Sequence, residues 1–250
     1  MLLRLRRLVR ATSLWGVVVG LLVFTSGAAS ATPVHNSNTF GLVASYEFTE
    51  NAHDSSGNGN DGVVNGATPT TDRFGNANSA YSFDGVDDFI DPGAHFAGDA
   101  EFSQLVWVKP AAPVSGGETR IIQAGVGGIY LDTTLDELIF EMLADRVGGT
   151  ANGTSPSTRF LYQTPASVAG NDWYHLALIG HSNNDLDVYI NGALAHSGAG
   201  VTDDGQNSNY ENSLIGAGHP HQLSPGVNFK FFSGDIDDVY IYDRALSPSE

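Results

Sequence analysis

Short apolar runs separated by Gly, Asn, Asp and Pro recur along most of the chain. No window of eleven or more residues shows helical periodicity, whereas several runs alternate between apolar and polar positions. Such alternation is typical of β-strands that bury one face. Asp185–Ile190 is the clearest case, with Leu186, Val188 and Ile190 on one face and Asp187 and Tyr189 on the other. The pattern therefore predicts an all-β sandwich or barrel.

The apolar runs define the expected strands, and the residues between them define the turns. Asn191-Gly192 favours a two-residue type I′ hairpin turn, and Asp84-Gly85 is also a tight-turn dipeptide. Two long polar stretches, 148–164 and 198–212, are expected to be surface loops, where binding residues often lie. The expected strands are Leu42–Phe48, Tyr81–Phe83, Phe89–Ile90, Phe102–Val108, Arg120–Gln123, Gly128–Leu131, Glu137–Leu143, Trp173–Gly180, Asp185–Ile190, Ala193–His196, Ser213–Gly216 and Phe231–Tyr242.

Residues 1–31 have the pattern of a signal peptide. Four arginines precede the apolar run Leu14–Phe24, and Ala29-Ser30-Ala31 supplies a small-residue cleavage site. The apolar run is short for a bilayer, and no later stretch approaches the ~20 apolar residues that a membrane-spanning helix needs. We therefore expect residues 32–250 to form one exported domain, extracellular or periplasmic, without a membrane span.

The charge of the chain argues against one class of partner, and its lack of cysteine excludes some chemistry. The whole chain carries a net charge of −17, and without residues 1–31 the remaining seven basic and 28 acidic residues give −21. An acidic surface repels phosphate backbones, which argues against a nucleic-acid partner. A salty habitat and a bound divalent cation both suit such a charge. The absence of cysteine excludes disulfides and thiolate chemistry.

Six segments, in order, carry a family resemblance. Residues 52–62 read AHDSSGNGNDG, residues 81–90 read YSFDGVDDFI and residues 106–110 read VWVKP. Further along are WYHLA at 173–177, VYING at 188–192 and GDIDDVYIY at 234–242, followed by RALS. This order and spacing resemble the laminin G-like, concanavalin A-like jelly-roll domains of secreted bacterial proteins. The resemblance implies two antiparallel sheets packed face to face. It does not imply one function, because such domains bind glycans, bind proteins or accompany catalytic domains.

The loop from Asp54 to Asp61 is a candidate metal site. Asp54, Asn58 and Asn60 offer side-chain oxygens, and the intervening glycines permit a tight backbone path. Calcium takes six to eight such oxygens, although the spacing is not that of an EF-hand. An Asx-rich turn without metal is the alternative.

Asp237 is the second candidate metal ligand. In simple alternation it shares a face with Val239 and Ile241, so its carboxylate would point toward the core. A buried carboxylate there needs a metal, another cation or a bulge, and Arg73 or Arg244 is an alternative partner. The family resemblance implies a structural Ca²⁺ between the loop and the last strand, with the ligands Asp54, Asn58, Asn60, Asp237 and Asp238.

Candidate ligand-binding residues combine aromatic rings with planar polar groups. A sugar presents C–H faces, which pack on aromatic rings, and hydroxyls, which hydrogen bond to carboxylate, amide and guanidinium groups. Candidates on the expected sheet and its rim are Arg120, Tyr130, Asp132, Asp145, Arg146 and Tyr210.

A catalytic site of a known type is not apparent in the sequence. Glu137 and Glu141 share a strand face, but at about 3.3 Å per residue they lie roughly 13 Å apart, too far for a retaining glycosidase pair. Arg120, Gln123, Tyr130 and His175 imitate a polysaccharide-lyase site only loosely. We therefore expect a binding module for carbohydrate or a cell-surface protein, with no reaction of its own. A glycoside hydrolase or lyase, and a protein-binding adhesion domain, remain alternatives.

Overall fold

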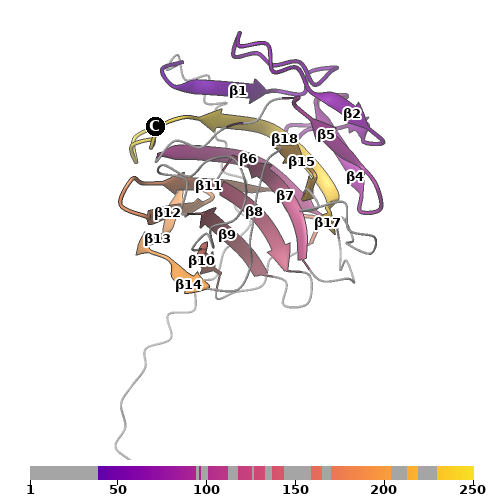
Figure 1. Ribbon diagram of the computed structural model, residues 1–250. Helices are drawn as coiled ribbons and strands as arrows, with labels where there is room; N and C mark the ends of the chain where they lie inside the picture. The colour runs from indigo at the N-terminus through magenta and orange to yellow at the C-terminus, as the bar shows by residue number, and fades with distance from the viewer. Residues whose placement is uncertain are drawn as a thin grey trace, which may run out of the picture.

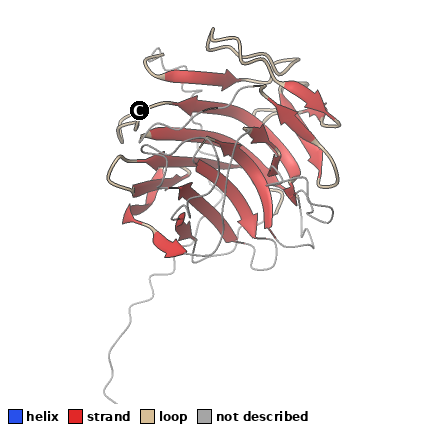
Figure 2. Cartoon of the chain, viewed as in Figure 1, coloured by secondary structure: helices blue, strands red, loops and turns tan. Residues whose placement is uncertain are grey.

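The structure is a computed structural model, which describes residues 39–93, 96, 101–111, 118–125, 127–132, 137–143, 159–164, 170–203, 213–218 and 230–250. Figure 2 shows that these residues form strands, turns and loops; within the described ranges there is no helix. The all-β prediction is confirmed. The expected signal peptide, residues 1–31, lies outside the described residues.

Two eight-stranded sheets build the domain (Figure 1). Sheet A has the order β13-β12-β11-β6-β18-β4-β3, and β1 also pairs with β18. The pairs are antiparallel. Its strands are β1 (Leu42–Tyr46), β3 (Thr68–Thr70), β4 (Ala80–Asp84), β6 (Phe102–Pro110), β11 (Tyr174–Gly180), β12 (Asp185–Ile190), β13 (Ala193–Ala199) and β18 (Ser233–Tyr242).

Sheet B has the order β14-β10-β9-β8-β7-β15-β5-β2. A separate two-stranded ladder pairs β16 with β17. The strands of sheet B are β2 (Val63–Asn65), β5 (Phe89–Asp91), β7 (Glu118–Ala124), β8 (Gly127–Asp132), β9 (Glu137–Leu143), β10 (Arg159–Gln163), β14 (Val201–Asp203) and β15 (Leu214–Ile215). The ladder comprises β16 (Ala217–Gly218) and β17 (Lys230–Phe231).

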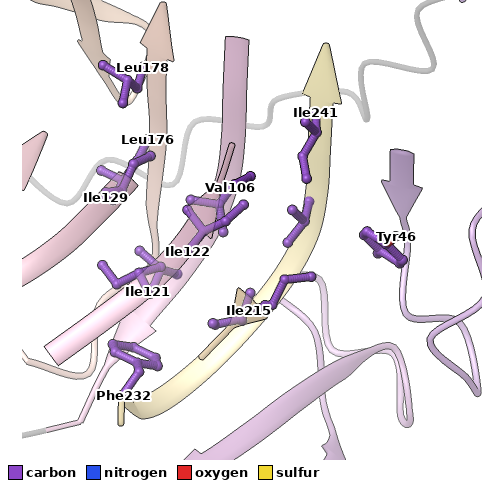
Figure 3. Packing of buried hydrophobic residues seen from close by; sticks show 14 of the residues in the cluster. Tyr46, Val106, Ile121, Ile122, Ile129, Leu176, Leu178, Ile215, Phe232 and Ile241 are labelled. Atoms are coloured by element: carbon purple, nitrogen blue, oxygen red, sulfur yellow. The ribbon is translucent and has the colours of Figure 1, made fainter. Parts of the chain in front are cut away.

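The core lies between the inner faces of the two sheets (Figure 3). Val106 from β6 and Leu176 from β11 are fully buried, as are Ile122 and Ile129 from sheet B. Burying each side chain of this size stabilises the fold by about 1.5–3 kcal/mol. The alternation in β12 is as predicted, because Leu186, Val188 and Ile190 belong to the core cluster.

The first and last strands lie side by side in sheet A (Figure 1). Ala44 pairs with Ile241, and just beyond the ladder the N–H of Asp243 donates to the carbonyl of Gly41 at 2.9 Å. Arg244 Nε donates to the carbonyl of Phe40 at 2.8 Å. Strand β1 and the residues before it are therefore hydrogen bonded to β18 and the residues that follow it.

Most of the expected strands are present, with two kinds of correction. The hairpin at Asn191-Gly192 is confirmed, and both residues have positive φ, 51° and 76°. The long polar stretches are not entirely loops, because β10 forms at 159–163 and β14 at 201–203. Asp84-Gly85 does not join a hairpin. The chain there leaves β4 in sheet A and enters β5 in sheet B.

Candidate functional site

A β-bulge in β7 gives the outer face of sheet B its polar residues. The pairing of β7 with β8 shifts between Arg120, which faces Tyr130, and Ile122, which faces Ile129. Ile121 and Ile122 both point into the core. Because the bulge inserts one residue, Arg120 and Gln123 fall on the same outer face although they are three positions apart.

Arg120 and Tyr130 form a stacked pair on this outer face. The guanidinium carbon of Arg120 lies 4.1 Å from the centre of the Tyr130 ring, a cation–π geometry. A Cβ on Gly128 would lie 3.4 Å from Nη1 of Arg120, so the guanidinium extends over a position without a side chain. The stem of Arg120 packs against Gly218 of β16. Both partners are buried, with exposed fractions of 9% and 1%.

Gln123 is the residue that sequence reasoning undervalued. It is 1% exposed, and among the described residues neither its carboxamide nitrogen nor its oxygen has a hydrogen-bond partner. It pairs across the ladder with Gly128, next to the Arg120–Tyr130 pair. An unsatisfied buried polar group costs about 1–3 kcal/mol. The sequence signal was a polar residue inside an apolar strand, but the bulge that aims it outward is not visible in the sequence.

The remaining candidate ligand-binding residues are not brought together by the described part of the chain. Asp132 ends β8, and its side chain lies outside the described part, as do Asp145, Arg146 and Tyr210 entirely. His175 lies on β11 in sheet A, away from the outer face of sheet B that carries Arg120, Gln123 and Tyr130. The four residues considered for a lyase site therefore do not form one cluster.

Asp54, the first candidate metal ligand, is surrounded by hydrogen-bond donors. Its Oδ1 accepts from the backbone N–H of Ser45 at 3.0 Å and of Ser56 at 2.9 Å. Its Oδ2 accepts from Ser56 Oγ at 2.8 Å and from the N–H of Asn60 at 3.0 Å. Burial would raise the pKa of Asp54, but these hydrogen bonds outweigh it and hold the pKa below its ordinary value.

The two asparagines of this loop bind the backbone of β1. Asn58 Nδ2 donates to the carbonyls of Leu42 at 2.8 Å and Val43 at 3.0 Å. Asn60 Nδ2 donates to the same Val43 carbonyl at 2.9 Å. The loop is therefore held against β1 by long-range side-chain to backbone bonds.

Asp237 does not point into the core, which corrects the prediction from simple alternation. The pairing of β18 with β6 shifts between Asp237, which faces Trp107, and Val239, which faces Val106. Asp238 occupies the bulge with a φ of 40°. Asp237 therefore lies with Trp107 on the outer face of sheet A, where Arg73 binds both aspartates.

This cluster shifts the pKa values of its members. Burial, and then the charge of Asp238, raise the pKa of Asp237 to about 7 against the opposing effect of Arg73. Burial and the Arg73 charge lower the pKa of His175, whose ring lies 5.1 Å from that of Trp107, to about 4. His175 is thus uncharged at neutral pH.

The expected calcium ligands consequently divide into two separate groups. Asp54, Asn58 and Asn60 bind β1, whereas Asp237 and Asp238 bind Arg73. Arg244, the other proposed partner of Asp237, pairs instead with Glu250 at 2.6 Å. This arrangement does not fit one calcium shared by the loop and the last strand, because both oxygens of Asp54 accept hydrogen bonds from the loop and β1, and Asp237 and Asp238 each bind Arg73 through one oxygen.

A different acidic group is found at the turn after β4. Asp84, Asp87 and Asp88 place carboxylate oxygens within 4.8 Å of one another. Among the described residues, no other group of three acidic or histidine side chains does so. Asp84 and Asp88 both accept backbone N–H groups of the turn. Their local bonding is that of a turn, and exposed acidic groups often cluster in this way without an ion.

Comparison with known proteins identifies the fold. The family model of the concanavalin A-like lectin/glucanases superfamily matches residues 84–250. Domain 4 of AbnA, a GH43 extracellular arabinanase from Geobacillus stearothermophilus solved with arabinotriose, is 22% identical, with a TM-score of 0.52. That match covers 83% of this chain and 95% of that one. A search of curated proteins gives no match.

Two toxin structures are also similar in fold. The binding domain of botulinum neurotoxin DC, in complex with rat synaptotagmin II, is 16% identical with a TM-score of 0.55. The structure of botulinum neurotoxin type C, whose cell entry depends upon interaction with two ganglioside molecules, is 14% identical with a TM-score of 0.53. Each match covers 84% of this chain and 50% of the toxin chain. Among the described residues no helix is long and apolar enough to cross a membrane.

Proposed function

Because the chain belongs to the concanavalin A-like lectin/glucanases superfamily, we propose that it is a secreted module that binds extracellular carbohydrate and catalyses no reaction. The observation that carries this proposal is the unpartnered carboxamide of Gln123 beside the Arg120–Tyr130 pair. We place the binding site on this outer face of sheet B.

The chemistry of Gln123 matches a sugar hydroxyl. A carboxamide offers two N–H donors and an acceptor oxygen, and a hydroxyl can donate and accept at once. A bound sugar would supply the missing partners, whereas an apolar ligand would leave them unsatisfied. Tyr130 and the guanidinium of Arg120 contribute the planar surfaces on which sugars pack. Since Gln123 is 1% exposed, a sugar enters only by local opening of this face, which slows association.

Proteins of similar fold that bind sugar-containing ligands support carbohydrate as the class of partner. The arabinanase domain is described with arabinotriose, and the type C neurotoxin with gangliosides. For this chain the net charge of −17 favours a neutral glycan, such as arabinotriose, over an acidic one. The toxin complex with synaptotagmin II makes a cell-surface protein the second candidate.

A glycan array on the purified protein, with two matched variants, tests the proposal. Gln123→Met removes the outward carboxamide. Gln104→Met removes a buried carboxamide that bonds the carbonyl of Ala124 between the sheets. We expect glycan binding by the wild type and by Gln104→Met, and a loss of about tenfold or more in affinity for Gln123→Met.

Three other outcomes would count against this proposal. Binding by all three proteins alike would move the site away from Gln123. A wild type that binds no glycan but retains an envelope protein, insensitive to competing sugar, would favour the adhesion alternative. Release of products from a polysaccharide, abolished by Glu137→Gln with Glu141→Gln, would favour an enzyme.

The secreted location rests on residues 1–31 alone. We expect N-terminal sequencing of protein recovered outside the cytoplasm of an expressing bacterium to begin at Thr32. Recovery of a chain that retains Arg4 to Arg10, in the cytoplasm, would contradict this part of the proposal.

A further inference from the structure

Arg73 is enclosed by two aromatic rings and two carboxylates. Its guanidinium carbon lies 4.4 Å from the centre of the Phe74 ring and 4.7 Å from that of Trp107. Its Nη1 donates to Asp237, and its Nη2 donates to Asp238 at 2.6 Å. The Arg73 side chain is 8% exposed, and those of Asp237 and Asp238 are 3% and 15% exposed. The guanidinium is therefore largely removed from water.

The bulge in β18 creates this arrangement. In a regular strand Asp237 and Asp238 would point to opposite faces of sheet A. The shift of pairing between Asp237 and Val239, with the positive φ of Asp238, lets both carboxylates reach the same guanidinium. Trp107 faces Asp237 across the β6–β18 ladder and supplies the surface beneath Arg73. Arg73 itself comes from the connection between β3 and β4, more than 160 residues earlier in the chain.

We propose that Arg73 is a built-in structural cation, which ties the β3–β4 connection to β18 and takes the place of the calcium expected at Asp237 and Asp238. A guanidinium bound to two carboxylates through separate nitrogens is a strong, geometrically specific contact. A calcium ion at the same oxygens would have to displace it from between the two rings or sit beside a like charge. The last strand is thereby held without a divalent cation.

Further acidic and titratable groups surround the Arg73 cluster. Two carboxylates share one guanidinium, and Glu47 and Asp72 add negative potential at Asp238. His175, adjacent to Trp107, stays neutral and adds no competing positive charge.

Thermal unfolding of the purified protein, with and without calcium, gives the primary test. We expect the same Tm in millimolar CaCl₂ and in excess EDTA, and no heat of calcium binding that Asp237→Asn removes. A Tm that falls in EDTA, through loss of an ion bound to the native state, would overturn the proposal if Asp237→Asn abolished that fall. The comparison of CaCl₂ with EDTA requires only the wild type to fold, and Asp237→Asn is needed only if a calcium effect is found.

Substitution of the arginine gives the second test. Arg73→Met keeps the length of the side chain but leaves two buried carboxylates without their partner, and we expect the Tm to fall by about 6–20 °C. Arg244→Met is the matched control, because it also removes an arginine–carboxylate pair but one at the end of the chain, and its fall should be several-fold smaller. Equal falls for the two variants would contradict a special role for Arg73. The readouts are Tm and calcium binding, so they are independent of glycan binding.

Discussion

Gln123 is a residue whose burial costs stability, and that cost is measurable. Its carboxamide has no hydrogen-bond partner in the part of the chain that the structure describes. Replacing it with methionine of similar volume removes the unsatisfied groups, so we expect Gln123→Met to raise the Tm by about 2–10 °C in the absence of ligand. Differential scanning calorimetry of wild type and variant measures the change. A lowered Tm would mean that the Gln123 side chain stabilises the fold, which would contradict a carboxamide left unpaired for ligand binding.

Asp237 gives the protein a pH dependence of known sign. Its pKa is raised from 3.8 to about 7, so its protonation stabilises the fold fully below about pH 3.8, and this contribution is lost as the pH rises through 7. The charged and titratable groups around it are Asp238, Arg73, Glu47, Asp72 and His175. The lowered pKa of His175 acts in the opposite sense, because that stability is lost as the pH falls below about 6.5.

The two effects separate above pH 6.5, where His175 is neutral in the folded and mostly neutral in the unfolded state. We expect the wild-type Tm to fall between pH 6.5 and 8.5, and the Asp237→Asn variant to lose most of that slope. Thermal scans at fixed ionic strength across this range measure it. The same slope in both proteins would show that another group causes it.

Single residues were also where the sequence was hardest to interpret. The oxygens of Asp54 were expected to bind calcium, and in the structure they accept hydrogen bonds from the N–H groups of Ser45, Ser56 and Asn60. Arg73 was one of two possible partners for Asp237, and no sequence pattern links residues so far apart. The sheet face on which Asp237 and Gln123 lie depends on bulges in β18 and β7. One inserted residue moves every later side chain of the strand to the opposite face, so simple alternation gives the wrong face beyond a bulge.

At the scale of the strands, the β12–β13 hairpin depends on a backbone conformation. Gly192 has a φ of 76°, and nothing lies within 4 Å of the position where a Cβ would stand. Substitution there therefore changes backbone strain alone. We expect Gly192→Val to lower the free energy of unfolding by about 1–2 kcal/mol and Gly192→Asn to change it much less, because asparagine tolerates this region. Urea denaturation measures both, and equal losses would point to a cause other than backbone strain.

The strands that were found and those that were missed differ in a physical way. Central strands such as β6 and β11 were recognised from their runs of apolar residues. In β11 these residues are buried from Leu176 to Gly180, whereas in β6 burial alternates along most of the strand. The sequence of β10, RFLYQ, is also apolar, but it is short and lies in a polar stretch. Its place in the sheet comes from pairing with β9 and β14. The crossing from β4 to β5 likewise depends on which sheet each strand joins, and local turn chemistry does not encode that choice.

For the whole molecule, the strongest global property is the net charge of −17. Repulsion among acidic groups destabilises the compact state and is screened by salt. We therefore expect the Tm to rise between 0.02 and 0.5 M NaCl, a range over which the Debye length shortens about fivefold. Calcium chloride at matched ionic strength should give the same rise, within about 2 °C. A larger rise in calcium would indicate specific binding and favour the divalent-cation explanation of the acidic composition.

The pairing of β1 with β18 also determines how this module can be combined with others. Phe40 and Arg244, which flank the two ends of the fold, are joined by a hydrogen bond, so the chain enters and leaves the sandwich at neighbouring points. A short flexible linker from residue 250 back to residue 39 would therefore close the polypeptide into a ring without disturbing either sheet. New termini opened at Asn191-Gly192, a turn whose two residues are exposed, would yield a circular permutant with an unchanged core. By the same geometry, the domain could be inserted into a surface loop of a host protein, since its two ends need only the spacing of adjacent strands.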